Sequence, residues 1–214
     1  MEINIQNASL RFKNNQVFND ISYEMRSGNR YGLVGYNGSG KTMLLRAICG
    51  FVRLSSGSIY VDGKELGIKG YEFIDNAGVI VGEVDFFKEL TGIDNLRLLA
   101  KIQNKIDDER LYEVLSDVGL KGKEEIKYKK YSTGMKARLR IAQAIMEKPE
   151  ILILDEPFNG LDKEGVEIIS GIIDGYISDS KLLIITSHHE EDINNLCNIV
   201  LELDGGKIVN ENKR

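Results

Sequence analysis

The feature that most constrains this chain is a glycine-rich run, Gly35-Tyr36-Asn37-Gly38-Ser39-Gly40-Lys41-Thr42. It has the spacing of a phosphate-binding loop, which is Gly, four residues, then Gly-Lys-Thr. Residues 30–34 before it predict a strand, and residues 41–49 after it predict a helix. Backbone N–H groups of the loop and of the helix N-terminus would then converge on one anion. A glycine-rich turn that matches by chance is the alternative, and the matching flanks argue against it.

The residues of this run have separate expected roles. Lys41 is expected to reach the β- and γ-phosphates of a nucleoside triphosphate and to act in catalysis, and the Thr42 hydroxyl is expected to bind Mg²⁺. The expected nucleotide-binding residues are Gly35, Asn37, Gly38, Ser39, Gly40, Lys41 and Thr42. By itself the run indicates a nucleoside triphosphate, and the rest of the chain decides how it is used.

Composition excludes several classes of protein. The 214 residues, 42% of them hydrophobic, suffice for one sizeable core. The formal net charge of −5 offers no broad basic face, so no nucleic-acid partner is expected. Cys49 and Cys197 form no disulfide or metal pattern and are expected to be reduced core residues of a cytosolic protein. No apolar run is long enough to span a bilayer, and we expect any membrane part to come from another chain.

The residues before the loop predict strands. Ile3 and Ile5 alternate with polar neighbours, and Asn14-Asn15 predicts a turn, so an antiparallel sheet is expected beside the nucleotide core. Phe12 in this part has two interpretations. It is either a core aromatic or a platform on which a nucleotide base stacks.

The fold class expected is α/β, with a P-loop NTPase core made of a mixed sheet flanked by helices. A short strand is predicted at residues 58–61, followed by Asp62-Gly63 as a hairpin turn, and a buried strand is predicted at residues 77–81. From Asp94 the apolar period becomes helical. One domain, 1–214, is expected: residues 1–82 and 149–214 form the core with its N-terminal antiparallel β subdomain, and residues 83–148 form an inserted α-helical subdomain.

An apolar run that ends in two carboxylates, Ile151-Leu152-Ile153-Leu154-Asp155-Glu156, predicts a central parallel strand. Ligands of such sheets bind at the carboxyl ends of the strands. Asp155 is therefore a candidate Mg²⁺ ligand, and Glu156 a candidate general base for the attacking water. The alternative is a solvated strand end with two surface acids.

Further candidates follow other predicted elements. Ser132 precedes a strong helix that Pro149 stops, and it is either a simple N-cap or part of a second helix N-terminus that is offered to phosphate. A second apolar strand, residues 182–185, leads to His188, which is a candidate γ-phosphate contact. His189 is taken as its surface neighbour. A helix over residues 164–177 and a final hairpin over residues 199–209 complete the prediction.

In this order the motifs resemble the nucleotide-binding subunit of an ATP-binding cassette (ABC) transporter, over residues 3–209. Residues 35–42 match Walker A, residues 151–156 match Walker B, Leu161-Asp162 matches the D-loop and His188 the switch histidine. Phe12 matches the aromatic A-loop position, which favours stacking. Residues 90–96 and 131–136 are most similar to bacterial drug, bacteriocin and lantibiotic-export ATPases.

Two motifs depart from the family pattern. The signature is Leu-Ser-Gly-Gly-Gln, and here Ser132 and Gly134 are kept while Thr133 and Met135 replace Gly and Gln. Close backbone approach at Thr133 is therefore less free than at glycine. The Q-loop glutamine is replaced by Gly82, with Glu83 beside it as a candidate substitute.

The resemblance implies an ATPase that uses ATP and Mg²⁺ in a head-to-tail dimer with a second ATPase subunit, which is either a homo- or a heterodimer. Each ATP is held between Walker A of one subunit and Ser132, Gly134 and Asp162 of the other. The helical insert would dock a separate transmembrane permease, with export as the expected direction, and the chain would lie on the cytoplasmic face of the membrane.

Two alternatives stay open. A soluble, non-transport member of the superfamily is disfavoured by the single Walker A and the net acidity. A weakly hydrolysing, ATP-gated clamp is disfavoured by the presence of Glu156 and His188.

Overall fold

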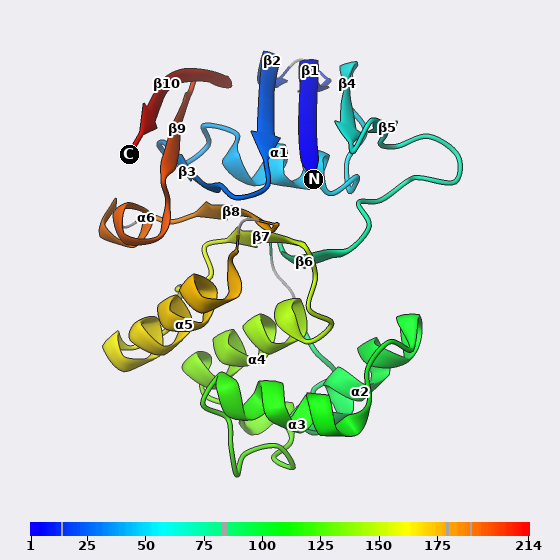
Figure 1. Ribbon diagram of the computed structural model, residues 1–214, viewed down its shortest axis with the longest axis vertical. Coiled ribbons are helices and arrows are strands. Elements are labelled where there is room, and N and C mark those ends of the chain that lie inside the picture. The colour runs from blue at the N-terminus through cyan, green and yellow to red at the C-terminus, as the bar shows by residue number, and fades with distance from the viewer. Residues whose placement is uncertain (14, 83–84, 179, 189) are drawn as a thin grey trace.

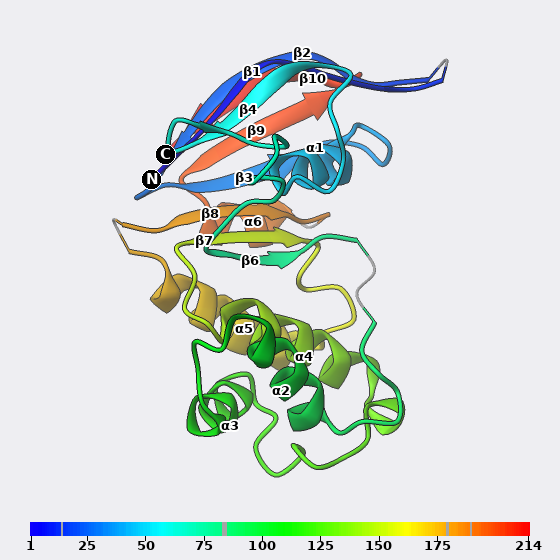
Figure 2. The ribbon, with the colours of Figure 1, turned by 90° about the vertical axis from the view of Figure 1, so that its right-hand side faces the viewer.

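The chain folds into two sheets with helices on both sides of the larger one, as Figures 1 and 2 show in a computed structural model. The structure describes residues 1–13, 15–82, 85–178, 180–188 and 190–214. Asn14, Glu83 and His189, each singled out in the sequence, lie outside the described residues. The expected α/β fold, with an antiparallel part ahead of the phosphate-binding loop, is confirmed.

The smaller sheet is antiparallel and has the strand order β2-β1-β4-β5. Its strands are β1 (Glu2–Phe12), β2 (Asn15–Arg26), β4 (Ser56–Val61) and β5 (Lys64–Glu65). Asp62 and Gly63 both have positive φ between β4 and β5, as the expected hairpin turn requires.

The larger sheet is mixed and has the order β10-β9-β3-β8-β7-β6. All its neighbouring strands are parallel except β9 and β10. The strands are β3 (Arg30–Val34), β6 (Ala77–Ile80), β7 (Ile151–Asp155), β8 (Leu182–Thr186), β9 (Ile199–Asp204) and β10 (Lys207–Lys213).

The helices are α1 (Lys41–Ile48), α2 (Gly92–Gln103), α3 (Asp108–Asp117), α4 (Thr133–Ile145), α5 (Lys163–Tyr176) and α6 (Glu190–Leu196), with a 3₁₀ turn at Tyr128–Lys130. In Figure 2, α1 lies between the two sheets, and α2 to α5 lie on the far side of the larger sheet. The sequence predicted α1, α4 and α5 within one residue at their N-termini. It missed α6. It also started α2 at Asp94, two residues late, because the helix begins directly after its cap Thr91, which accepts a hydrogen bond from the Asp94 N–H.

The central strands bury both faces. Ile151 and Ile153 of β7 belong to a core that also contains α1 and the smaller sheet. Leu152 and Leu154 belong to the core formed with the helices on the other side. This double burial explains why the strand is apolar throughout. Cys49 and Cys197 are buried as expected, and burial raises the pKa of both thiols to about 12.

The inserted helices pack directly on the core. A Cβ on Gly78 of β6 would lie 1.9 Å from the Ala144 carbonyl oxygen of α4, so this approach requires glycine. The boundaries of the helical subdomain at residues 83–148 stay a prediction.

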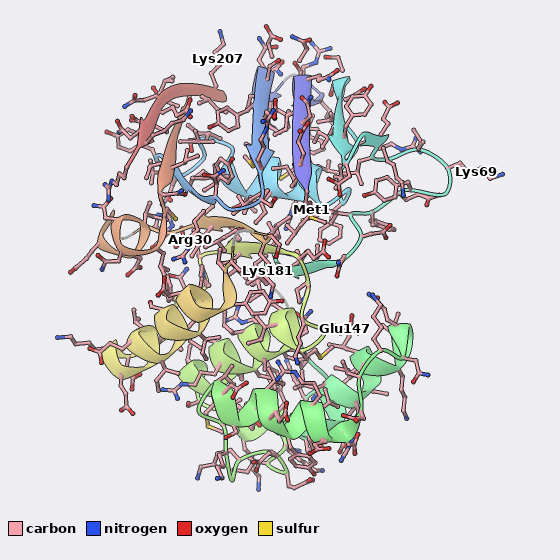
Figure 3. All side chains as sticks on the ribbon, in the orientation of Figure 1. Met1, Arg30, Lys69, Glu147, Lys181 and Lys207 are labelled. Carbon is pink, nitrogen blue, oxygen red and sulfur yellow. The ribbon has the colours of Figure 1, made fainter. Side chains whose placement is uncertain are left out.

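The outer surface carries charged side chains, and Lys69 and Lys207 in Figure 3 point away from the body of the molecule. Among the residues that the structure describes, no helix combines the length and apolar character that a membrane crossing needs.

Candidate functional site

The phosphate-binding loop connects the end of β3 to the start of α1. Three of its glycines have positive φ: Gly35 (144°), Gly38 (84°) and Gly40 (105°). At Gly35 a Cβ would lie 2.2 Å from the Leu203 carbonyl oxygen, so no other residue fits there. Gly40 is the N-cap of α1 and contributes no side-chain cap. The first N–H groups of α1 are therefore left for an anion.

Two side chains of the loop have polar atoms that a phosphate would satisfy. The Lys41 ammonium group is buried and donates hydrogen bonds to the carbonyl oxygens of Gly35 (2.7 Å) and Tyr36 (3.1 Å). The Ser39 hydroxyl is buried and has no hydrogen-bond partner among the described residues. A buried hydroxyl of this kind is costly unless a ligand pairs with it.

A network of hydroxyl and carboxylate groups lies at the carboxyl ends of β7 and β8. The Thr42 hydroxyl donates to Asp155 Oδ2 (2.8 Å), and the Thr186 hydroxyl donates to Asp155 Oδ1 (2.7 Å). Thr186 also accepts a hydrogen bond from the Glu156 N–H (2.9 Å). One carboxylate and one hydroxyl thus lie together, and Mg²⁺ sites next to phosphates typically use such oxygen ligands. Sequence reasoning predicted Thr42 and Asp155 but gave Thr186 no role.

Glu156 and His188 face each other across this end of the sheet. The His188 backbone N–H donates to Glu156 Oε2 (3.1 Å). Glu156 Oε1 lies 3.1 Å from His188 Nε2, without the alignment of a hydrogen bond. Burial raises the pKa of Glu156, and the neighbouring His188 opposes that rise. Glu156 also has a left-handed backbone conformation (φ 51°), which side chains rarely adopt outside functional or turn positions.

Lys41, Thr42, Asp155, Glu156 and His188 line one cleft of about 200 Å³. Its lining consists of Val17, Asn37, Gly38, Gly40, Lys41, Thr42, Met43, Asp155, Glu156 and His188. Val17 reaches it from β2, and no sequence motif pointed to that residue. Phe12 does not line this cleft and is half-exposed at the end of β1.

The signature residues line a separate cleft of about 270 Å³. Ser132, Gly134 and Asp162 are brought together there with Lys123, Arg138 and Gly160. Ser132 caps α4 by accepting a hydrogen bond from the Met135 N–H (3.2 Å), and Asp162 caps α5 by accepting one from the Gly165 N–H (2.9 Å). Ser132 therefore has the capping function that the sequence allowed, and the capping function of Asp162 is a finding of the structure.

At the Q-loop position, Gly82 has φ 75°, and a Cβ there would lie 2.6 Å from the Arg46 guanidinium. Arg46 therefore occupies the space into which a glutamine side chain would extend.

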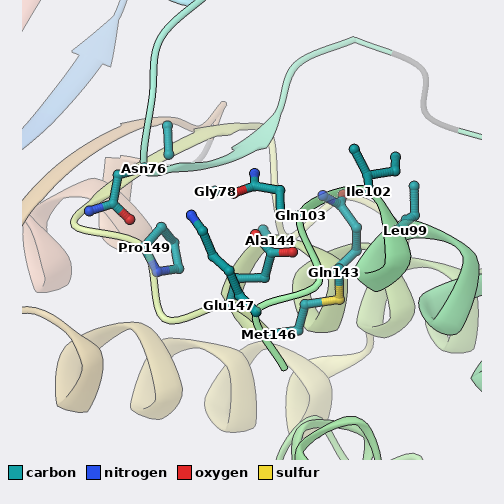
Figure 4. A pocket seen from close by; sticks show the side chains of 12 residues that line it. Asn76, Gly78, Leu99, Ile102, Gln103, Gln143, Ala144, Met146, Glu147 and Pro149 are labelled. Carbon is teal, nitrogen blue, oxygen red and sulfur yellow. The ribbon is translucent and has the colours of Figure 1, made fainter. Parts of the chain in front are cut away.

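Another cleft, of about 170 Å³, is drawn in Figure 4. It lies between the start of β6 at Asn76 and Gly78, the end of α2 at Ile102, and the end of α4. The amino ends of the strands lie here, whereas Walker A and Walker B meet at the carboxyl ends. This cleft is therefore not part of the candidate nucleotide site.

Comparisons with known proteins identify the family to which the chain is similar. A family profile described as ABC transporter matches residues 18–159. The chain is 41% identical to the ABC transporter ATP-binding protein YybJ of Bacillus subtilis (strain 168), over 99% of this chain and 96% of that protein. It is 31% identical to the lantibiotic transport ATP-binding protein SrtF of Streptococcus pyogenes, over 98% of this chain and 90% of that protein.

The fold is that of a solved ATP-binding cassette, MJ0796, in a dimeric post-hydrolysis state with ADP and Pi. The two structures superpose with a TM-score of 0.87 over 99% of this chain and 98% of that chain, at 19% identity. The family profile covers most of the chain, and the relative from Bacillus subtilis is similar along its whole length. The chain therefore belongs to the family of ABC transporter ATP-binding proteins.

Proposed function

We propose that this ATPase works as a head-to-tail dimer with a second ATPase subunit, in which ATP lies between the phosphate-binding loop of one subunit and the signature of the other. The observation that carries this proposal is that the two motifs line separate clefts of one chain. The cleft at Lys41 and the cleft at Ser132 share no lining residue. A second subunit would place its signature against the phosphates bound at Lys41.

In this arrangement each candidate residue has a role. The loop residues Gly35, Asn37, Gly38, Ser39 and Gly40 enclose the phosphates with their N–H groups, and Lys41 exchanges its carbonyl partners for phosphate oxygens. Thr42 and Asp155 hold Mg²⁺, which supplies positive charge against the phosphates. Phe12 stacks on the base. Ser132, Gly134 and Asp162 approach from the other subunit.

Hydrolysis is assigned to Glu156 acting as general base on the attacking water. A raised pKa makes this carboxylate a better proton acceptor, and its Oε1 has no hydrogen-bond partner among the described residues. The His188 backbone N–H fixes the other oxygen, and its imidazole, half-exposed in the cleft, contacts the γ-phosphate. Loss of the γ-phosphate then removes the group that joins the two subunits.

We further assign the dimer to export through a separate permease at the inner face of the cell membrane. The name of the relative from Streptococcus pyogenes refers to lantibiotic transport, and this supports a role in transport. The helical insert exposes apolar side chains that suit docking to another protein, namely Phe87, Leu98 and Ile102. The permease selects the transported substrate.

Glu156→Gln tests the dimer and the base together. This variant should bind ATP, lose turnover, and elute as an ATP-dependent dimer in size-exclusion chromatography with light scattering. Glu167→Gln, the same change on the exposed face of α5, should hydrolyse ATP like the unmodified protein. Unchanged phosphate release by Glu156→Gln would exclude this carboxylate as the base.

A pull-down from detergent-solubilised membranes tests the partner. A polytopic membrane protein that co-purifies with the tagged chain supports the transporter assignment. Recovery with ribosomes, or of the chain alone, would favour the soluble, non-transport alternative instead. If ATP closes the dimer but phosphate release is negligible in the unmodified protein, an ATP-gated clamp becomes the better description.

A further inference from the structure

The segment that follows Glu156 is folded tightly onto the body of the molecule. Two successive turns form it, closed by hydrogen bonds from the Asn159 N–H to the Glu156 carbonyl oxygen (3.2 Å) and from the Leu161 N–H to the Phe158 carbonyl oxygen (3.1 Å). Phe158 is buried in the core beneath the helices. Because the segment is short and anchored, a displacement of its far end moves Glu156.

The far end of this segment rests on the N-terminus of α4. A Cβ on Gly160 would lie 2.6 Å from Thr133 Cγ2, so the threonine methyl group fills the space above this glycine. The Gly160 carbonyl oxygen lies beside Gly134, 3.5 Å from where its Cβ would be. One turn further along α4, the Arg138 guanidinium lies 3.8 Å from Asp162 Oδ1. The segment is therefore held to the signature helix at both Gly160 and Asp162.

We propose that Thr133 is a positioning residue whose methyl group clamps the segment after Glu156 to the signature helix. The inference rests on the proposed function, in which the N-terminus of α4 faces the ATP of the other subunit. The family signature has glycine at this position and so has no methyl group to make the contact. In this chain the clamp connects two parts that act in different ATP sites of the dimer. These are α4, whose N-terminus faces the γ-phosphate of one site, and Glu156, the catalytic carboxylate of the other site.

Two substitutions separate the methyl group from the hydroxyl group of Thr133. Thr133→Ser removes the methyl and keeps the hydroxyl, and Thr133→Val does the reverse. With the purified chain, Thr133→Ser should lower kcat by about tenfold while KM for ATP changes little, because misplacement of a catalytic group acts on the chemical step. Thr133→Val should retain kcat. The opposite result, or no effect of either change, would overturn the clamp.

A double-mutant comparison measures the contact without ATP. Gly160→Ala should lower the Tm of the ATP-free chain more strongly when Thr133 is present than in a Thr133→Gly background, because only the threonine methyl clashes with the new Cβ. Gly63→Ala is the matched control. Gly63 has a similar φ (76°) and nothing within 4 Å of its would-be Cβ, so its effect on Tm should be the same in both backgrounds.

Equal effects of Gly160→Ala in the two backgrounds would overturn the clamp alone. Failure of the proposed function would give a different experimental result, since Glu156→Gln would then form no ATP-dependent dimer. That result would also overturn the positioning role, even if the Tm comparison showed the contact.

Discussion

The N-termini of α1 and α4 both have backbone N–H groups that can bind an anion. They differ in whether a side chain already caps these groups. At α1 the N-cap is Gly40, without a capping side chain, and Lys41 bonds to carbonyl oxygens of its own loop. At α4 the Ser132 hydroxyl already satisfies the Met135 N–H. The N-terminus of α1 is therefore open without a ligand, whereas that of α4 is capped and, in the proposed dimer, would exchange its cap for phosphate. In the proposed dimer, this difference favours binding of the nucleotide first to the loop of one subunit and then to the signature of the other.

The largest effect is expected at Lys41. Lys41→Ala removes a charge-assisted contact with phosphate worth about 1.5–3 kcal/mol, so the ATP affinity of the single subunit should fall about 10–150-fold. Titration with a fluorescent ATP analogue measures this. Lys123→Ala, which removes the same charge from the signature cleft, should leave single-subunit affinity unchanged. Equal losses in the two variants would contradict the comparison.

Replacing the glycines at the two helix N-termini by alanine should change the free energy of unfolding in opposite directions. Gly40→Ala forces a side chain to φ 105° and places a Cβ 3.3 Å from the Val17 carbonyl oxygen, so unfolding should become easier by about 1–2 kcal/mol. Gly134 has no positive φ, and alanine there should stabilise α4 by about 0.5–1 kcal/mol. Urea unfolding of both variants measures these differences, and destabilisation by Gly134→Ala would refute the second expectation.

The cap at Ser132 allows stability and phosphate binding to be separated. Ser132→Ala should lower stability by about 1 kcal/mol, or the Tm by about 2–4 °C. Ser132→Asp keeps a capping oxygen and should restore the Tm, but its charge should repel the γ-phosphate and prevent the ATP-dependent dimer. Thermal melts and light scattering, done on both variants, test the pair. A dimer formed normally by Ser132→Asp would remove Ser132 from the proposed interface.

The smallest effect concerns the charge of Glu156. Because burial raises its pKa in the folded state, the folded chain binds this proton more tightly than the unfolded chain. Stability from this group is therefore present at low pH and is lost as pH rises from the ordinary glutamate range through the raised pKa. Glu156→Gln should therefore be more stable than the unmodified chain at pH 7 and should have the higher Tm.

The difference between these two proteins should vanish below the ordinary pKa of glutamate, where both side chains are neutral. Melting curves across this pH range decide the point. A constant difference at all pH values would mean that the titration of Glu156 is not its cause.

Much of the fold followed from short-range patterns in the sequence. Strands were predicted at residues 30–34, 151–156 and 182–185, and each of these ranges corresponds to a central strand of the larger sheet. By contrast α6, Glu-Glu-Asp-Ile-Asn-Asn-Leu, has only two apolar residues and gives no helical period. Its place depends on contact with β3, where a Cβ on Gly32 would lie 2.5 Å from Ile193. Such a contact cannot be read from local spacing.

The residues of the candidate site likewise divide into those that the sequence predicted and one that it missed. Lys41, Thr42, Asp155 and Glu156 were predicted because their motifs fix the spacing of chemical groups along the chain. Thr186 was missed, although its hydroxyl joins Asp155 to the Glu156 N–H, because it acts through the register in which Asp155 pairs with Thr186 across two strands. Nothing along the chain specifies that register.

By itself, the sequence determined that this protein has a phosphate-binding loop, an acidic strand end and a helix with a serine cap, since each depends on neighbours a few residues away. Only the tertiary structure decided that the loop and the signature line separate clefts, and that the methyl group of Thr133 lies against Gly160. These features depend on how strands and helices pack side by side. Packing is set by burial of apolar faces from distant parts of the chain, and not by the order of residues within any one motif.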